Sequence, residues 1–160
     1  MSQSDPARQL LRHAVATIAY RGCKALRGAS DTFADFHVSQ DARTPGQILA
    51  HIGDLLDWAL STASGQQKWQ ASTPLPWQQE VSRFFGALEA LDDYLASDSP
   101  LQTSAERLFQ APIADALTHV GQIAMLRRLA GAPVRAENFY VANIASGVVT
   151  ADQPAPVQEF

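Results

Sequence analysis

Residues 112–131, PIADALTHVGQIAMLRRLAG, contain the pattern that decides the fold. If this stretch is helical, apolar side chains occur on nearly every side of the helix, which is typical of a buried helix. Pro112 stands at its start, and Gly131 followed by Pro133 is a common way for a helix to end. We therefore expect a central helix here that is the most buried helix of the chain.

Three earlier stretches also have apolar residues at helical spacing. The first begins at Asp5-Pro6 and the second at Thr44-Pro45, and in each a capping side chain precedes a proline in the first turn. The third begins near Pro76-Trp77. The expected helices run to about residues 28, 65 and 95. Because no stretch alternates with a period of two residues, the sequence predicts an all-α fold, a four-helix bundle.

The connections between these helices are long, at about residues 29–43, 65–75 and 96–111. Such lengths favour at least one crossover along the bundle. The chain therefore divides into a bundle over residues 1–132 and an irregular C-terminal extension over residues 133–160. One short helix is expected near residues 136–146, and the apolar residues of the extension indicate that it packs against the bundle or a partner subunit.

The composition excludes several classes of protein. The chain has 160 residues, of which 46% are hydrophobic and 18% charged, so we expect one domain with a substantial core. A net charge of −4 with scattered basic residues argues against nucleic-acid binding. No apolar stretch approaches the length of a membrane span. One cysteine, Cys23, and no signal-peptide pattern predict a cytoplasmic protein.

Asp115 and His119 are candidate metal ligands. Their spacing of four residues places both side chains on one side of a helix, where they can reach one ion. Gln122 follows on the same side. Two other interpretations remain open for Asp115: an ion pair with His119, and an acid of the first turn that complements the helix dipole.

His51 is the candidate ligand of the second helix. It lies at the edge of the apolar stripe, and Asp54 and Trp58 share its flank at three and seven residues further on. Asp54 could then orient His51 from behind as a supporting hydrogen-bond partner. The alternative is a histidine at the core edge that bonds only to Asp54 or to a backbone carbonyl. His13, His37 and Cys23 lack a comparable pattern, and His13 is expected to be solvated.

Two stretches resemble the DinB/YfiT-like superfamily. Residues 44–58, TPGQILAHIGDLLDW, resemble its second-helix motif, and residues 115–131, DALTHVGQIAMLRRLAG, resemble its fourth-helix motif. The resemblance covers about residues 5–132. It implies a four-helix bundle of up-down-down-up type that binds a divalent metal through three histidines, one from the second helix and two from the fourth.

Carried over by motif, the resemblance assigns the metal to His51, Asp115 and His119. Asp115 stands where the family has histidine, which implies a site of two histidines and one carboxylate, or a site that has lost its metal. Zinc or nickel suits imidazole ligands best, with iron or manganese as alternatives. Asp54 or Gln122 would support the ligands, Trp58 would lie beside the pocket, and Tyr140, in the segment 137–140, could close over it.

The resemblance further implies a metal-dependent enzyme that acts on a small molecule, as a thiol-dependent transferase or a hydrolase. A low-molecular-weight thiol is then a candidate partner, and no catalytic residue is assigned. The alternative is a non-catalytic binding protein that lost its metal through the change at Asp115. We also expect a homodimer, because relatives are often dimers, because the His13, Tyr20 and Cys23 face of the first helix carries little charge, and because the extension is rich in hydrophobic residues. The alternative is a monomer whose extension folds back on its own bundle.

Overall fold

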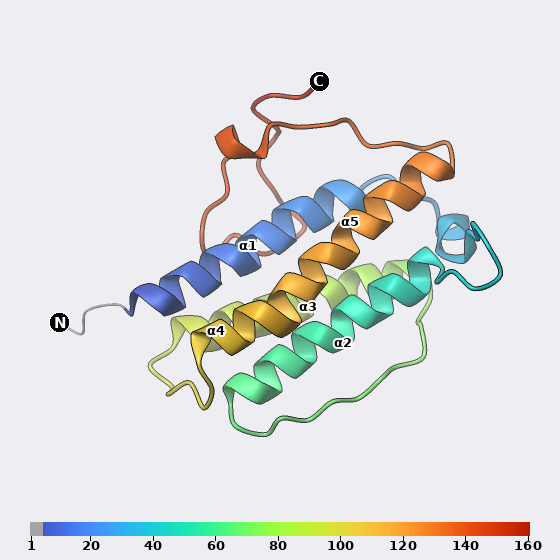
Figure 1. The fold of residues 1–160 in the computed structure, drawn as a ribbon. Helices are drawn as coiled ribbons and strands as arrows, with labels where there is room; N and C mark the ends of the chain where they lie inside the picture. Colours follow the sequence, from blue (N-terminus) through green and yellow to red (C-terminus); the bar gives the residue numbers. More distant parts are fainter. Residues whose placement is uncertain (1–4) are drawn as a thin grey trace.

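The computed structural model describes residues 5–160, and its regular structure is helical. Four long helices pack side by side (Figure 1): α1 (Pro6–Leu26), α2 (Pro45–Ala63), α3 (Trp77–Ala96) and α5 (Ala114–Leu129). The shorter elements are η1 (Asp31–Asp35), α4 (Ala105–Leu108), η2 (Phe109–Ile113) and η3 (Phe139–Val141). Apart from one antiparallel bridge between Glu137 and Glu159, the described residues contain no β-structure, so the all-α prediction is confirmed. Residues 1–4, which the predicted bundle domain included, lie outside them.

The predicted starts of the first two helices are confirmed together with their caps. The Asp5 carboxylate accepts a hydrogen bond from the Ala7 backbone at 3.0 Å, which satisfies one of the free N–H groups at the start of α1. α2 begins with a capping box, in which Thr44 and Gln47 each bond to the backbone of the other. α3 begins at Trp77, as its pattern predicts.

The fourth helical region begins earlier than expected. Ser104 caps it, and the helix continues through α4 and η2 into α5. η2 is a π-helical turn with Pro112 inside it. Proline has no N–H to donate, so the regular hydrogen bond to the preceding turn is missing there and the helix widens locally. Pro112 therefore marks a distortion within the helical region and not its first residue.

The prediction that this helix is the most buried one is wrong. Met125 and Leu129 of α5 are 53% and 57% exposed, and α2 has the larger number of buried residues. α5 packs against α1 and α2 through one side only, so its apolar outer side remains at the surface. A continuous apolar pattern cannot distinguish a buried helix from one with an uncovered apolar face.

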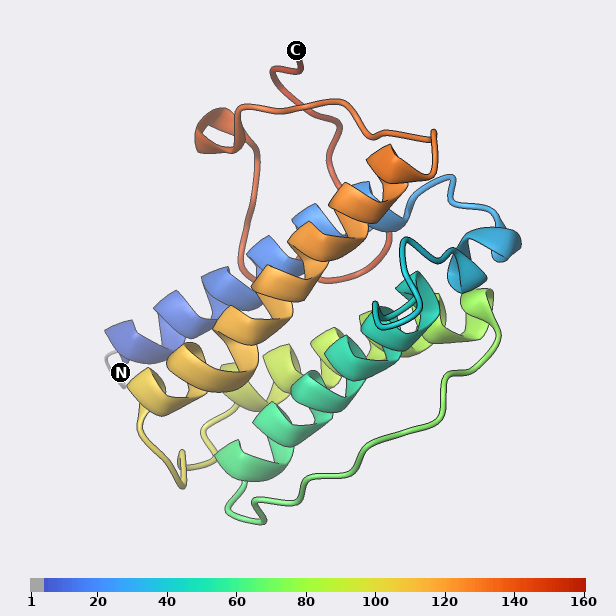
Figure 2. The same ribbon diagram turned by 45° about the vertical axis from the view of Figure 1, so that its right-hand side comes forward.

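The four long helices form a four-cornered arrangement. α1 contacts α3 and α5, and α2 contacts the same two helices. In Figures 1 and 2, α1 and α5 run in one direction and α2 and α3 in the other. Since α2 and α3 are neighbours with the same direction, the segment 64–76 must return along the whole length of α2, and both views show it doing so. The expected crossover is therefore present.

The crossover is anchored to α2 by a buried carboxylate. Asp54 accepts hydrogen bonds from the backbone and hydroxyl groups of Ser72 at 3.0 and 2.7 Å. Arg83 of α3 donates to the same carboxylate at 2.7 Å. These bonds join the crossover, α2 and α3 at one point, and they hold the preceding residues of the crossover against α2.

The extension, residues 133–160, is irregular except for η3, as expected, and folds back onto its own chain. Tyr20 of α1 donates to Glu137 at 2.5 Å, and Lys24 pairs with Glu137 and Glu159 at 2.8 and 2.7 Å. Tyr20 is 3% and Cys23 5% exposed. This part of the first-helix face is thus covered within one chain, and the homodimer stays a prediction. None of the helices in residues 5–160 has the length and apolar character needed to cross a bilayer.

Candidate metal centre

The structure brings together the three residues that the sequence predicts as metal ligands. His51 comes from α2, and Asp115 and His119 come from successive turns of α5. Each offers one ligand atom, and these atoms all lie within 4.8 Å of one another. The packing of α2 against α5 therefore adds the third side chain to the pair that helical spacing already placed together.

The distances fit a metal ion after a small contraction. His51 Nε2 lies 3.8 Å from Asp115 Oδ2. Bonds of 2.0–2.2 Å to a tetrahedral zinc ion place ligand atoms about 3.3 Å apart. The side chains must therefore move together by about an ångström or less per ligand, which a change of side-chain torsion can supply. The residues present fit a metal of the kind that binds imidazole and carboxylate.

A backbone contact selects the nitrogen of His119 that would bind the metal. His119 Nδ1 lies 2.8 Å from the carbonyl oxygen of Asp115. A carbonyl only accepts, so the hydrogen-bond network assigns the proton to Nδ1 and leaves the lone pair on Nε2. Such a bond fixes both the tautomer and the ring orientation of a metal-binding histidine.

Burial of His51 lowers the pKa of its imidazole, and the proximity of His119 and Arg43 lowers it further, against the opposing effect of Asp115 and Asp54. The neutral imidazole is therefore the form that His51 holds near neutral pH. It is also the form that binds metals.

The cluster also permits the alternative that the sequence left open. Asp115 Oδ1 lies 3.2 Å from His119 Nδ1, so the carboxylate could pair with protonated imidazoles without any metal. An ion pair with His51 requires the protonated form of that ring, which the lowered pKa disfavours. The two rings lie 4.7 Å apart at 67°, and both meet at the carboxylate. The lowered pKa of His51 therefore favours a ligand set over a charged pair with that ring, whereas the contact of Asp115 with His119 Nδ1 fits either arrangement.

Asp54 does not support His51. Its carboxylate is occupied by Ser72 and Arg83, as described above, and it makes no hydrogen bond to the imidazole within the described part of the chain. The neighbour of His51 is instead Trp69 of the crossover, whose ring lies edge-on at 5.8 Å. Trp58 packs against Trp69 in the same manner, so it lies one aromatic ring further from His51.

Sequence reasoning missed Trp69 because the crossover has no periodic pattern. The only signal is a tryptophan within the polar stretch GQQKWQAS, residues 65–72, where a large aromatic residue needs a partner. Trp69 is 47% exposed, so it covers one side of His51 without sealing it.

An open groove of about 740 Å³ runs along α5 beside the cluster. His119 and Gln122 line it, so Gln122 faces the groove and makes no hydrogen bond to a ligand within residues 5–160. Arg43, from the segment before α2, is the charged residue of its wall. The apolar part of the wall consists of Val38, Ala42, Ile48, Met125, Leu126 and Leu129.

The structure does not bring Tyr140 to the cluster. Its side chain is 95% exposed, and the segment that carries it packs against α1 through Glu137. His13 and His37 are exposed, as expected for His13. Cys23 is buried, and its thiol donates to the carbonyl of Ala151 at 3.4 Å.

Comparisons of the chain with protein-family models, with curated proteins and with solved structures gave no match. Assignment of a metal centre therefore rests on the arrangement of His51, Asp115 and His119 and on the groove beside them.

Proposed function

We propose that this protein binds one divalent transition-metal ion through His51, Asp115 and His119 and uses it on a small molecule. The observation that carries this proposal is that three ligand atoms, one from α2 and two from α5, lie within 4.8 Å of one another. They lie at the edge of an open groove. Three protein ligands leave a coordination position free, which is typical of a catalytic and not a structural site.

The resemblance of residues 44–58 and 115–131 to the DinB/YfiT-like superfamily supports the same proposal. We propose that the four long helices form the up-down-down-up bundle of that superfamily, with Asp115 at the position of a family histidine. The directions of the helices and the crossover at residues 64–76 agree with this topology.

A bound divalent ion would supply Lewis-acid chemistry, which activates a water or a thiol near neutral pH. The chain's own residues have separate roles. Asp115 carries the negative charge of the ligand set and its carbonyl orients His119, while Trp69 limits the access of water to His51. Arg43 lies near enough to lower the pKa of His51, so it is placed to hold a negative group of the substrate.

The groove restricts the substrate. Its wall is mostly apolar, which favours a small molecule with an apolar body, and its charged side chain is cationic. A thiol-dependent transferase or a hydrolase that acts on such a molecule fits this wall. A non-catalytic binding protein that uses the groove without a metal is the second candidate, and the open groove alone supports it equally well.

Elemental analysis of protein purified without an affinity tag separates the two candidates. About one equivalent of zinc, nickel, iron or manganese per chain is expected for the metal-dependent enzyme. Less than about a tenth of an equivalent, with no gain when the purified protein is dialysed against each ion, would support the non-catalytic candidate.

Asp115→His is the informative variant, because it introduces the residue that the family resemblance implies at this position. If Asp115 is a ligand, the variant should retain or increase the metal content, since imidazole binds zinc at about 2.0–2.1 Å. Arg128→His, at an exposed position of the same helix outside the groove, serves as the control and should leave the metal content unchanged.

A further inference from the structure

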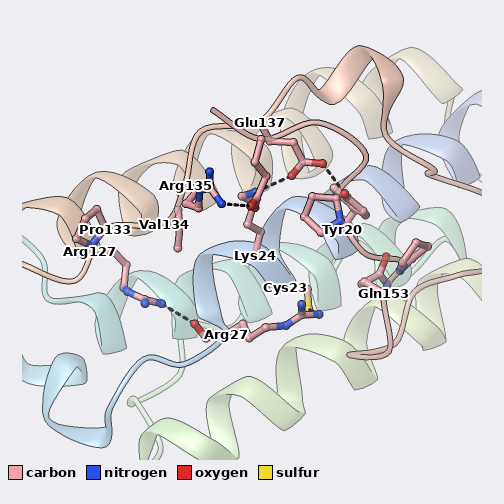
Figure 3. A pocket seen from close by; sticks show the side chains of 13 residues that line it. Tyr20, Cys23, Lys24, Arg27, Arg127, Pro133, Val134, Arg135, Glu137 and Gln153 are labelled. Carbon is pink, nitrogen blue, oxygen red and sulfur yellow. Dashed lines mark hydrogen bonds and ion pairs between the residues drawn. The ribbon is translucent and has the colours of Figure 1, made fainter.

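A second cavity lies between α1, the end of α5 and the extension, away from the candidate metal centre (Figure 3). Its volume is about 320 Å³, the lower end of the range for small-molecule sites. A neighbouring cavity of about 290 Å³ shares Lys24, Val134, Arg135 and Glu137 with it. The two cavities therefore lie on either side of the segment 134–137.

Basic side chains are concentrated around these two cavities. Six of the chain's 12 lysines and arginines line them: Arg21, Lys24, Arg27, Arg127, Arg128 and Arg135. Only two of its 16 acidic residues, Glu137 and Glu159, do so. A chain with a net charge of −4 thus gathers an excess of positive charge in one recess.

The two carboxylates do not neutralise this charge. Both are engaged by Lys24, and Glu159 also lies 3.5 Å from Arg135. Arg27 and Arg127 have no carboxylate within 4.0 Å in the described part of the structure. Both line the 320 Å³ cavity.

Arg127 is 6% exposed and is held rigidly by backbone carbonyls. Its Nε donates to Ala132 at 2.9 Å, and its Nη1 donates to Ala25 at 3.0 Å and to Arg27 at 2.9 Å. Nη2 makes no hydrogen bond within residues 5–160, and it is not among the fully enclosed unpaired atoms. A fixed guanidinium therefore keeps one donor nitrogen without a partner, in a residue that lines this cavity and also the cavity beside Phe33.

Arg27 is also held in place. Its Nη2 donates to the sulfur of Cys23 at 3.3 Å, and its backbone carbonyl accepts from Arg127. Figure 3 shows Arg27 and Arg127 on one side of the cavity and Lys24 and Arg135 on the other. The apolar part of the wall includes Pro133, Val134, Pro154 and Pro156, and Tyr20, Cys23 and Gln153 also line the cavity.

We propose that this cavity binds the phosphate or carboxylate group of a small organic anion, with Arg27 and Arg127 as the anchoring guanidiniums and Arg135 at the entrance. Guanidinium groups form short, paired, charge-assisted hydrogen bonds with such oxyanions. The proline and valine wall takes the carbon skeleton of the ligand. The site does not depend on a metal at His51, Asp115 and His119.

The test is a titration of the full chain at constant ionic strength, followed by calorimetry and by amide chemical shifts. Pyrophosphate and succinate serve as separate probes for the phosphate and the carboxylate form. We expect saturable binding of one equivalent of at least one probe, with shifts confined to residues 20–27, 127–137 and 153–159, which contain the lining of the cavity. Shifts centred on His51 and His119, or no saturable binding of either probe, would overturn the proposal.

Variants identify the anchoring residue. Arg27→Gln removes an exposed side chain without a carboxylate partner, so the fold should be retained, and binding should weaken about tenfold or more. Arg107→Gln is the matched control, because Arg107 is exposed on α4, and it should leave binding unchanged. Equal weakening by the two substitutions would show nonspecific screening and would refute the site.

Discussion

The candidate metal centre and the cationic cavity lie on two flanks of α5, and they are built in opposite ways. The metal centre takes two ligands from successive turns of α5 and a third from the helix that packs against it. The cavity takes its charged side chains from α1, from the end of α5 and from an irregular extension more than 100 residues from α1. Helical spacing therefore indicates the first site in the sequence, whereas only the folded extension creates the second.

The two sites also differ in how their charges are held. At the metal centre, the burial of His51 favours the neutral form and leaves a carboxylate facing two imidazoles. At the cavity, Arg127 stays buried without a carboxylate because the carbonyls at the ends of α1 and α5 surround it. Burial lowers the pKa of Arg127, but an arginine keeps its proton throughout the physiological range.

The largest effect is expected at Arg127. Arg127→Met keeps an apolar stem but leaves the carbonyls of Ala25, Arg27 and Ala132 without their donor, so we expect a loss of about 3 kcal/mol in the free energy of unfolding. Urea denaturation of Arg128→Met, in which an exposed neighbour is changed, provides the control and should show a loss below about 0.5 kcal/mol. Equal losses of stability in the two variants would contradict the role of the Arg127 hydrogen bonds in joining the ends of α1 and α5.

Among residues near the metal centre, Asp54 should have the largest effect on the free energy of unfolding, because its carboxylate holds the crossover to α2 and α3. Asp54→Asn weakens the bonds from Arg83 and Ser72, and we expect a loss of about 2 kcal/mol at pH 7. Asp57 accepts a bond from the same Arg83 nitrogen but its side chain is 59% exposed, so Asp57→Asn should cost less than about 1 kcal/mol.

The Asp54 effect should depend on pH. Burial acts to raise the pKa of Asp54, but the bonds from Arg83 and Ser72 outweigh it and hold the pKa below its ordinary value of 3.8. The stabilisation is therefore complete above about pH 4 and is lost as the pH falls through the lower pKa of the folded state. In denaturation series at pH 7 and pH 3, the difference between the wild type and Asp54→Asn should shrink at pH 3. If the stability difference between the wild type and Asp54→Asn is the same at both pH values, the effect of Asp54 comes from packing and not from its charge.

A smaller loss of stability is expected at the contact between the extension and α1, where Tyr20 bonds to Glu137. Tyr20→Phe removes the hydrogen bond to Glu137, whose side chain is fully buried and still pairs with Lys24, so the loss should be about 1 kcal/mol. Limited proteolysis should cut the 133–160 segment faster in this variant. Tyr140→Phe, at a residue that is 95% exposed, should match the wild type in both measurements, and a similar loss there would argue against a specific fastening.

The smallest effect on affinity is expected at Trp69, which touches His51 without being a ligand. Titration with zinc should change the tryptophan fluorescence, and Trp69→Phe should remove most of that change while altering the zinc affinity by less than about threefold. Trp77→Phe is the control, because Trp77 is buried against Phe33 away from the site and its loss should leave the zinc-dependent signal in place. If the zinc-dependent fluorescence change persists in Trp69→Phe, zinc does not bind beside His51.

The starts of the helices could be predicted because they depend on neighbouring residues. The Asp5-Pro6 and Thr44-Pro45 pairs combine a capping oxygen with a proline that fits the first turn, and the structure forms both caps. The pairing of Asp115 with His119 follows from helical geometry in the same way. Pro112 shows the limit of such local signals, because a π-helical turn lets the helix continue through it.

The remaining features depend on contacts between distant parts of the chain. Nothing in the sequence near Asp54 shows that Arg83 and Ser72 will occupy its carboxylate in place of His51. The crossover that brings Trp69 to His51 and the extension that brings Glu137 to Tyr20 have no periodic pattern. For the same reason, six basic residues that are scattered in the sequence gather around two cavities in the fold.

The most direct test of the central claim is an equilibrium titration of the tag-free protein with zinc and with nickel in competition with a chelator. We predict one equivalent bound per chain, and a loss of more than about 100-fold in affinity for both His51→Ala and His119→Ala, since removal of a ligand exceeds the effect of changing its supporting residues. His13→Ala changes an exposed histidine of α1 and should bind as the wild type does. Affinity that is unchanged in His51→Ala, or no stoichiometric binding of either ion, would contradict the account.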